Sequence, residues 1–338
     1  MTGKPSASNV RVRKIIHKTK EVTESIDVTA IKLDTLEAET RFPCSLYIRE
    51  KSGVLKKILD KDGIYTIGLQ SALLKLENPE VLVDREEMND YLNYITAIRQ
   101  EKLKARKQQL TKQSRNIYTS ASDTLEKLFQ KPDCPDLMSE ARTILTGAVD
   151  FVKSDQFSVN TLIDVSSKDY STHTHCMDTA IVSLGFANHL KFNNNDLNNI
   201  GLSALLHDIG KSRVDQAIIN KDGTLTEEEF ELVKKHPLFG FFILKAHKET
   251  NRDILNGIRS HHEKYDGSGY PDKLQGKEIP LFAQIISMAD IFTAITTNKT
   301  YRDACSSFDT INIMKNTMSF AFDGNLFMEF IKFMGPKN

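Results

Sequence analysis

Residues 196–212, DLNNIGLSALLHDIGKS, indicate how the C-terminal half of this chain is built. Their apolar side chains recur at helical spacing and lead into His207 and Asp208, which predicts an amphipathic helix ending in two polar groups. Lys211 follows within one helical turn, on a neighbouring face. Imidazole suits transition metals, a carboxylate can bridge two of them, and a lysine can meet an anionic substrate. A lone His-Asp pair is common and is more often structural, so a metal site requires further ligands.

Further candidate ligands lie where helices could bring them to the same centre. They are His175 in YSTHTHCMDTAIVSL, His236 in VKKHPLFG, His261 and His262 in HHEKYDGSGYP, and Asp290 in IISMADIFTAITT. Each has an ordinary alternative as a packed helix residue, a helix-end cap or a hydrogen-bonded buried carboxylate. Together with His207 and Asp208 they form a set that we predict to bind metal. The remaining histidines, 17, 173, 189 and 247, are expected at the surface or in packing.

The fold class expected from the chain as a whole is α+β. Strand-like runs (SLYIRE, GVLKKIL, EVLVD) and a helical run (GLQSALLKL) predict a small α/β regulatory or interaction domain over residues 25–98. Residues 99–144 are predicted to form a helical connector, interrupted at KPDCPD, which could support a homodimer. Helical signals then continue almost to the end, so residues 145–338 predict an all-α domain. Residues 1–24 are basic and are expected to form a flexible tail.

Composition excludes several function classes. Lys plus Arg and Asp plus Glu both total 45, so no global basic field predicts binding to DNA or RNA polymers. The basic segment KLKARK is better explained as a solvated helix face than as a phosphate patch. The four cysteines are scattered without CxxC spacing, and neither a signal peptide nor a membrane-spanning run is evident. We therefore expect a cytoplasmic protein without membrane insertion.

The segment NKDGTLTEEEF resembles half of a calcium-binding EF-hand loop. If Gly223 held the glycine position of that loop, Ile218 would fall where the first carboxylate ligand is required, which argues against calcium. Thr226 and Glu229 instead have the spacing of a capping box. This pattern predicts the start of a helix that delivers His236.

These motifs occur in the order seen in the HD-GYP family, which the chain resembles over residues 145–335. The matching segments are Tyr170 to His175, LLHDIGK, KDGTLTEEEF followed by His236, HHEKYDGSGYP, and ADIFTAITTNKTYR. The resemblance implies a helical phosphohydrolase domain with a metal centre that hydrolyses cyclic di-GMP. The segment before residue 98 resembles, more weakly, small modules that precede such domains in bacterial proteins.

The resemblance also implies roles for individual residues. One divalent ion, iron or manganese, would be held by His175, His207, Asp208 and Asp290, and a second by Asp208, His236, His261 and His262. Water activated by the two ions would attack phosphorus, while Asp208 and Lys211 act as catalytic residues. The residues expected to contact the substrate are Lys211, Tyr270, Lys299, Tyr301 and Arg302. The glycine-rich turn at Tyr270 could also contact a partner protein.

The chain departs from the family pattern at four positions. Family members commonly have arginine at the position of Gln284, aspartate at that of Thr293, and Arg-Pro at those of Lys299 and Thr300. Loss of a bidentate arginine weakens phosphate recognition. Three hypotheses follow: a cyclic di-GMP phosphodiesterase coupled to a regulatory module, a catalytically weak effector that binds nucleotide or proteins, and a hydrolase of a hybrid cyclic dinucleotide.

Ser171 stands four residues before His175, where some family members have a glutamate that helps to hold a third metal. A neutral hydroxyl is a poor ligand for an additional divalent ion. We therefore expect a binuclear centre that mainly opens the ring and releases the linear dinucleotide pGpG.

Overall fold

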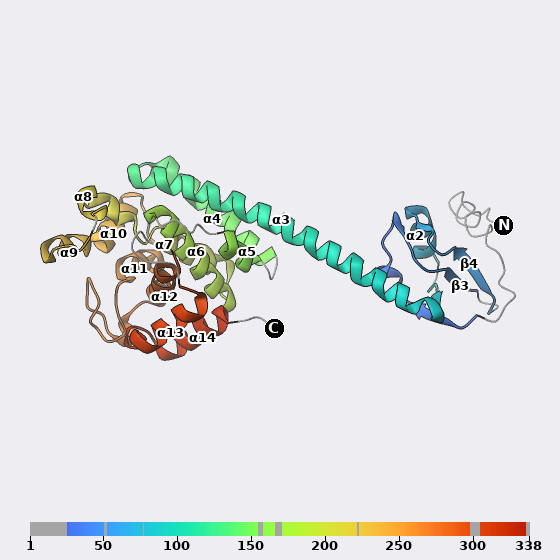
Figure 1. Cartoon of the computed structure of the whole chain (residues 1–338). Coiled ribbons are helices and arrows are strands. Elements are labelled where there is room, and N and C mark those ends of the chain that lie inside the picture. The colour runs from blue at the N-terminus through green and yellow to red at the C-terminus, as the bar shows by residue number, and fades with distance from the viewer. Residues whose placement is uncertain are drawn as a thin grey trace, which may run out of the picture. The chain divides into compact units, whose positions relative to one another are not determined.

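The computed structural model describes residues 26–50, 53–76, 78–154, 158–165, 171–221, 223–297 and 305–335 (Figure 1). The chain forms two compact units, Met1–Lys107 and Gln108–Asn338. The predicted tail, the start of the first histidine motif at Tyr170, and the positions Lys299, Thr300, Tyr301 and Arg302 lie outside the described residues. The predicted substrate contacts in that last group therefore stay predictions.

The first unit contains a four-stranded sheet in the order β1-β6-β3-β4, in which all paired strands are antiparallel. Its strands are β1 (Val28–Ile31), β3 (Leu46–Arg49), β4 (Leu55–Leu59) and β6 (Val81–Asp84), and β2 (Thr40–Arg41) pairs separately with β5 (Ile64–Tyr65). The helix α2 (Ile67–Leu74) and the short helices η1 (Leu33–Thr35) and η2 (Arg85–Glu87) complete it. The three predicted strand runs and the helical run are confirmed, and with antiparallel pairing the module is of the α+β kind.

The core of this unit explains why the sequence folds in this way. Phe42, Leu46, Tyr65 and Leu73 are fully buried, and their apolar surface drives the sheet and α2 together. A further helix begins immediately after η2 and continues this core.

That helix is α3 (Met88–Gln130), and its first turns are fixed to the small unit. The Tyr91 hydroxyl lies 2.7 Å from the Thr35 hydroxyl, and the Tyr94 hydroxyl lies 2.7 Å from the Thr40 hydroxyl. Both tyrosine rings also contact Phe42 edge to face. These contacts make the start of α3 part of the small unit.

The second half of α3 belongs to the helical unit. Leu110, Tyr118, Leu125 and Leu128 are buried in its core, as are side chains of α4 (Pro135–Ser154). The helix ends at Gln130 because the KPDCPD segment interrupts it, and Pro135 then starts α4. The helical unit therefore begins at Gln108 rather than at residue 145, and α4 is one of its core helices rather than a connector.

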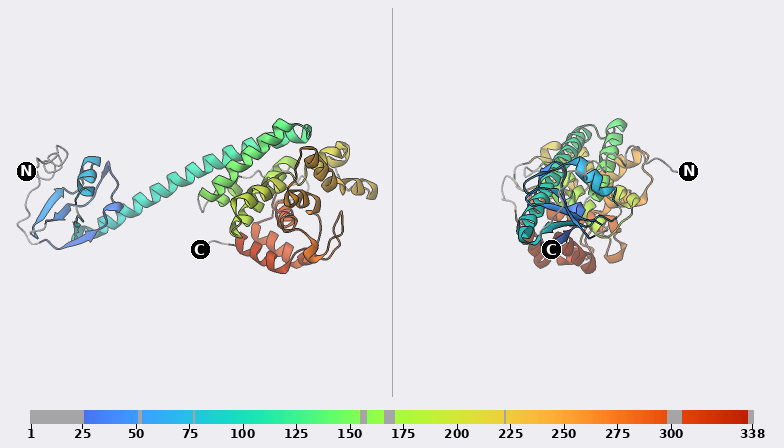
Figure 2. Two further views of the ribbon diagram at one scale, coloured as in Figure 1. Left: turned by 180° about the vertical axis from the view of Figure 1, so that it is seen from behind. Right: turned by 90° about the vertical axis from the view of Figure 1, so that its right-hand side faces the viewer.

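The rest of the unit is helical, as predicted. Its elements are α5 (Ser158–Val165), α6 (Thr172–His189), α7 (Asn194–Leu205), η3 (Ile209–Arg213), α8 (Gln216–Ile219), α9 (Glu227–Val233), α10 (His236–Ala246), α11 (Arg252–Ser260), η4 (Gly276–Glu278), α12 (Leu281–Thr296), α13 (Ser307–Thr317), η5 (Ser319–Ala321) and α14 (Gly324–Met334). Helices α6, α7, α11 and α12 pack on one another, and η3 packs on α10. The red helices α13 and α14 lie together along one side of the unit (Figure 2). Across the described residues, no helix combines the length and apolar content that a membrane span requires.

Candidate metal centre

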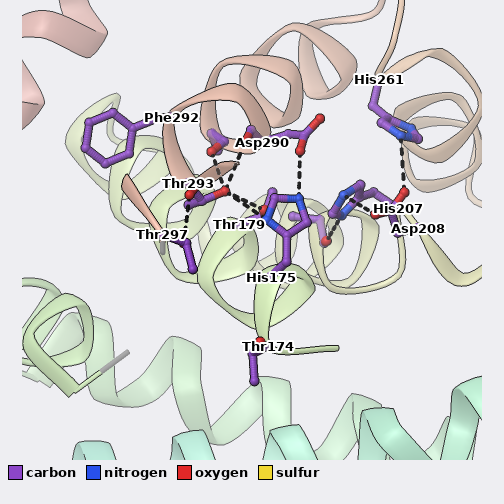
Figure 3. Close-up of polar contacts among 12 residues, drawn as sticks. Thr174, His175, Thr179, His207, Asp208, His261, Asp290, Phe292, Thr293 and Thr297 are labelled. Carbon is purple, nitrogen blue, oxygen red and sulfur yellow. Dashed lines mark hydrogen bonds and ion pairs between the residues drawn. The ribbon is translucent and has the colours of Figure 1, made fainter. Parts of the chain in front are cut away.

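Asp208 lies at the centre of the histidine cluster. It follows the C-terminal end of α7 and is 1% exposed. Its carboxylate is 3.4 Å from Nε2 of His207, 3.1 Å from Nε2 of His236 and 4.0 Å from Nε2 of His261. Figure 3 shows the His207 and His261 rings turned toward this carboxylate. Three histidines from distant parts of the chain therefore present the same ring nitrogen to one acid.

Backbone carbonyls fix the protonation of these three rings. Nδ1 of His207 lies 2.7 Å from the Ala204 oxygen, and His236 and His261 make equivalent 2.7 Å contacts with the oxygens of residues 233 and 258. A ring nitrogen so close to a carbonyl oxygen must carry the proton, so Nε2 of each neutral ring has a free lone pair. The same arrangement orients histidine ligands in metalloproteins.

The Nε2 atoms of the histidines and the Asp208 carboxylate crowd together. Nε2 of His236 lies 3.2 Å from Nε2 of His261 and 3.1 Å from Oδ1 of Asp208. Among the described side chains, Nε2 of His207 and Oδ1 of Asp208 are buried without a hydrogen-bond partner. Buried acceptors facing one another are costly unless a cation lies among them. The donor set thus fits divalent metal.

The remaining predicted ligands complete two sets that share Asp208. One set is Asp208, His236, His261 and His262, and the other is His175, His207 and Asp208; within each, one ligand atom per residue lies within 4.8 Å of the others. Asp290 on α12 adjoins the second set, because its Oδ1 is 2.8 Å from Nε2 of His175 on α6 (Figure 3). All seven predicted ligands are brought together.

Electrostatics favours the protonation states that metal binding requires at Asp208, His261 and His262. Burial raises the pKa of Asp208, but the nearby Lys211 ammonium and the His207 ring outweigh it and hold this pKa well below its ordinary value. Burial and the neighbouring histidines lower the pKa of His261, and they lower that of His262 to about 3. For His207, burial lowers the pKa, but the Asp208 carboxylate outweighs burial and raises it. Ionised Asp208 and neutral His261 and His262 are the forms that bind cations.

Gly210 of the HDIGK motif allows η3 and α10 to approach closely. A Cβ atom at this position would lie 1.9 Å from the His236 carbonyl oxygen and 2.5 Å from the Gly240 nitrogen. Only glycine therefore permits the contact that holds His236 beside Asp208. The predicted capping box is confirmed, since the Thr226 and Glu229 side chains each accept the other's backbone N–H at the start of α9, which precedes His236.

The GYP turn is held by a residue that the sequence analysis did not single out. Glu263 is 2% exposed, and its carboxylate accepts the N–H groups of Asp272 at 2.7 Å and Leu274 at 3.1 Å. The turn keeps Tyr270 against His262, with ring centroids 4.8 Å apart. The signal was present as the third residue of HHE, but an acid beside two histidines resembles another ligand until its backbone partners are known.

The two described departures from the family pattern make local contacts. The Gln284 amide donates to the Ile279 carbonyl at 2.8 Å. The Thr293 hydroxyl donates back to the Ala289 carbonyl at 2.9 Å and lies 3.4 Å from Nδ1 of His175. Thr293 therefore contacts the side of the His175 ring that carries Nδ1. Gln284 contacts the backbone of the residue before Pro280, the N-cap of α12.

Comparison with known proteins agrees with this geometry. Residues 160–326 match the family model described as HD domain. This part of the chain is similar to HD domains. The match agrees with the predicted resemblance to the HD-GYP family over residues 160–326, the region that contains the His/Asp cluster.

Curated relatives match part of the chain. The chain is 32% identical over 174 residues to the cyclic di-GMP phosphodiesterase PA4108 of Pseudomonas aeruginosa, covering 52% of this chain and 42% of that protein. It is 32% identical over 140 residues to the 3′3′-cGAMP-specific phosphodiesterase 2 of Vibrio cholerae, covering 41% of this chain and 27% of that protein. The chain thus spans less than half the length of these relatives.

A solved structure resembles this chain in fold over most of its length. Bd1817, described as an HDG"Y"P protein from Bdellovibrio bacteriovorus, aligns with a TM-score of 0.58 and 18% identity, over 90% of this chain and 99% of that one. At this identity the match supports the fold alone.

Proposed function

We propose that this protein is a metal-dependent phosphodiesterase that hydrolyses cyclic di-GMP. The observation that carries the proposal is the cluster of buried imidazole nitrogens around the Asp208 carboxylate, in which His236 Nε2 lies 3.1 Å from a carboxylate oxygen. Such a set fits cations, and two divalent cations beside a lysine suit phosphodiester hydrolysis. The names of the relatives support cyclic dinucleotides as the substrate class.

The proposed ligands are those of the two sets that share Asp208, with Asp290 joining His175 and His207. Iron or manganese suits this mixture of imidazole and carboxylate. When bound, two such ions would supply an activated water and neutralise charge on the phosphoryl oxygens.

The chain's own groups would position the substrate. Lys211 Nζ donates to Asp208 Oδ2 at 2.5 Å, so its ammonium lies where a non-bridging phosphoryl oxygen would approach the shared carboxylate. Tyr270 packs on His262, and we assign it to the substrate side of that histidine. Lys299, Tyr301 and Arg302 stay candidates from the sequence.

We further propose that the reaction stops mainly at the linear dinucleotide pGpG. Ser171 is the N-cap of α6, and its hydroxyl accepts the Thr174 N–H at 3.2 Å while lying 2.9 Å from the Thr174 hydroxyl. A hydroxyl engaged in a capping box is a poorer metal ligand than a free carboxylate. Two ions then serve the first cleavage, and residue 171 offers no carboxylate to a third ion that would hold the product for a second one.

The experiment is a time course with the full chain reconstituted with iron or manganese. Cyclic di-GMP, linear pGpG and GMP are separated by chromatography, and bound metal is measured in the same preparation. We expect two metals per chain and accumulation of pGpG. Absence of turnover would overturn the proposed activity, whereas GMP formed without a linear intermediate, or a third tightly bound ion, would overturn the role of Ser171.

A catalytically weak effector is the second candidate. Gln284, where an arginine is common in the family, contacts the Ile279 carbonyl and so provides no cation for phosphate. The same time course separates the two functions, because an effector retains cyclic di-GMP without hydrolysing it. A third candidate, hydrolysis of a hybrid cyclic dinucleotide, predicts faster turnover of 3′3′-cGAMP than of cyclic di-GMP.

We propose that the small unit regulates the helical unit or recruits a partner protein. Its buried contacts with Tyr91 and Tyr94 fix it to the first turns of α3, which continues into the core of the helical unit. A homodimer through α3 and a protein partner at the GYP turn stay proposals. Sedimentation of the full chain with and without cyclic di-GMP tests the dimer.

A further inference from the structure

A cleft of about 570 Å³ opens beside Lys211, on the side of the centre where α3 ends. Its walls come from the last turns of α3, the N-terminal end of α6, α8 and the segment that leads to α9. Figure 1 shows α8 beside that end of α3. The volume lies in the range of small-ligand sites and suffices for one nucleoside part of a dinucleotide.

Lys211 connects the cleft to the metal centre. Its Nζ contacts Asp208, while its side chain also lines the cleft. A phosphodiester held beside Asp208 and Lys211 would therefore direct one of its attached nucleosides into this space.

The cleft has the two kinds of wall that a nucleobase needs. Phe129, Ile219 and Leu225 supply apolar surface for the flat faces of a base. Glu126, Gln130 and Asn220 supply polar groups for its edges. Of these three, only Glu126 is a pure hydrogen-bond acceptor when ionised, because each amide also donates.

We propose that this cleft holds a guanine base of the substrate and that Glu126 is its specificity residue; the identity of the ligand rests on the proposed function. Guanine presents two adjacent donors, N1–H and N2–H, which match the two oxygens of a carboxylate. Adenine presents one donor beside a ring nitrogen with a lone pair, which a carboxylate repels. Glu126 thus favours cyclic di-GMP over cyclic di-AMP, and a guanine of 3′3′-cGAMP over its adenine.

The test compares Glu126→Gln with Asp123→Asn in the metal-reconstituted full chain. Glu126→Gln keeps the size of the side chain but replaces a pure acceptor by an amide that suits adenine. Asp123 is exposed on the same helix, one turn earlier, so its variant removes the same charge on a neighbouring turn. Titration calorimetry measures binding of GMP and AMP, and initial rates give kcat/KM for cyclic di-GMP and cyclic di-AMP.

We expect Glu126→Gln to weaken GMP binding about tenfold, to leave AMP binding equal or tighter, and to lower the preference in kcat/KM for cyclic di-GMP by a similar factor. Asp123→Asn should change none of these values. Unchanged GMP affinity in Glu126→Gln, or an equal loss in Asp123→Asn, would overturn the guanine subsite even where the wild type is active. If the wild type hydrolyses no cyclic dinucleotide but GMP binding still depends on Glu126, the subsite stands and the phosphodiesterase proposal fails.

Discussion

At the scale of single residues, the metal centre depends most on Asp208, the carboxylate common to both ligand sets. We expect Asp208→Ala to lose both ions, whereas His175→Ala or His262→Ala should lose mainly the ion of its own set. Metal content per folded chain, measured by mass spectrometry, checks this. Asp150→Ala, an exposed acid on α4, is the control. A normal complement of two ions in Asp208→Ala would exclude the shared-ligand assignment.

Lys211 should act on turnover and not on metal content, since an ammonium cannot ligate a cation. Lys211→Ala is expected to keep both ions and to lose about 100-fold or more in kcat, comparable with loss of one group that stabilises transition-state charge. Parallel metal analysis and rate measurements check the separation. A folded Lys211→Ala protein without metal would contradict the role, because it would mean that the lysine holds Asp208 in place for binding.

Asp178 provides a pH-dependent contribution to stability. Burial raises its pKa from the ordinary 3.8 to about 7, although the Tyr118 hydroxyl, which hydrogen-bonds to it, lowers the pKa in part. Between pH 4 and 7 the folded state therefore holds more protons than the unfolded state, so the free energy of unfolding falls as pH rises and levels off above 7. The loss is roughly 4 kcal/mol at most, and water in the adjoining cavity of about 460 Å³ would reduce it.

The corresponding variant is Asp178→Asn, which keeps an acceptor for Tyr118 but cannot ionise. Thermal unfolding between pH 5 and 8 should show a gain in stability over the wild type that grows with pH and is constant above pH 7. The exposed variant Asp150→Asn should follow the wild type. A gain that is the same at every pH would show that Asp178 does not change its protonation on unfolding.

At the scale of elements, the contact between η3 and α10 determines whether His236 reaches Asp208. Gly210→Ala places a Cβ against the His236 carbonyl oxygen, so we expect a loss of about 3 kcal/mol or more in stability together with loss of metal. Gly147→Ala on α4 is the matched control, because its Cβ meets no atom within 4 Å and alanine favours a helix by about 0.5–1 kcal/mol. Chemical unfolding and metal analysis check both variants. A Gly210→Ala protein as stable as Gly147→Ala would show that the contact is not tight in solution.

At the scale of the whole molecule, the boundary of the helical unit decides which fragment can fold. Residues 108–338 retain Leu110, Tyr118, Leu125 and Leu128 of α3, whereas a fragment that starts at residue 145 loses these buried side chains with Met138 of α4. Each is worth about 1.5–3 kcal/mol of burial, and together they are comparable with the net stability of a typical domain. We expect the 108–338 fragment to fold and bind metal and the 145–338 fragment to aggregate or unfold. Circular dichroism, gel filtration and metal analysis compare them, and equal stability would contradict the boundary at Gln108.

The sequence by itself determined that the C-terminal half is helical and that strands precede it, and it identified the seven candidate ligands. Periodicity and capping patterns are local properties, so residues 196–212 and the Thr226–Glu229 box carry their structure within a few turns. The ligand motifs were also recognisable locally, because each combines chemistry-bearing residues at fixed spacing. The predicted interruption of the long helix at KPDCPD followed from proline alone.

Only the tertiary structure decided where the helical unit begins, which groups the Glu263 carboxylate contacts and which oxygen of Asp208 each histidine approaches. These features depend on contacts between residues far apart in the chain. Side chains of α3 that look like an ordinary helix seam in sequence belong to the same buried core as side chains of α4 and α6. Glu263 beside two histidines has the pattern of a ligand, and only the backbone N–H groups of residues 272 and 274 reveal its structural role. Crowded lone pairs likewise arise from packing, because the protonation of each ring depends on the carbonyl that its other nitrogen meets.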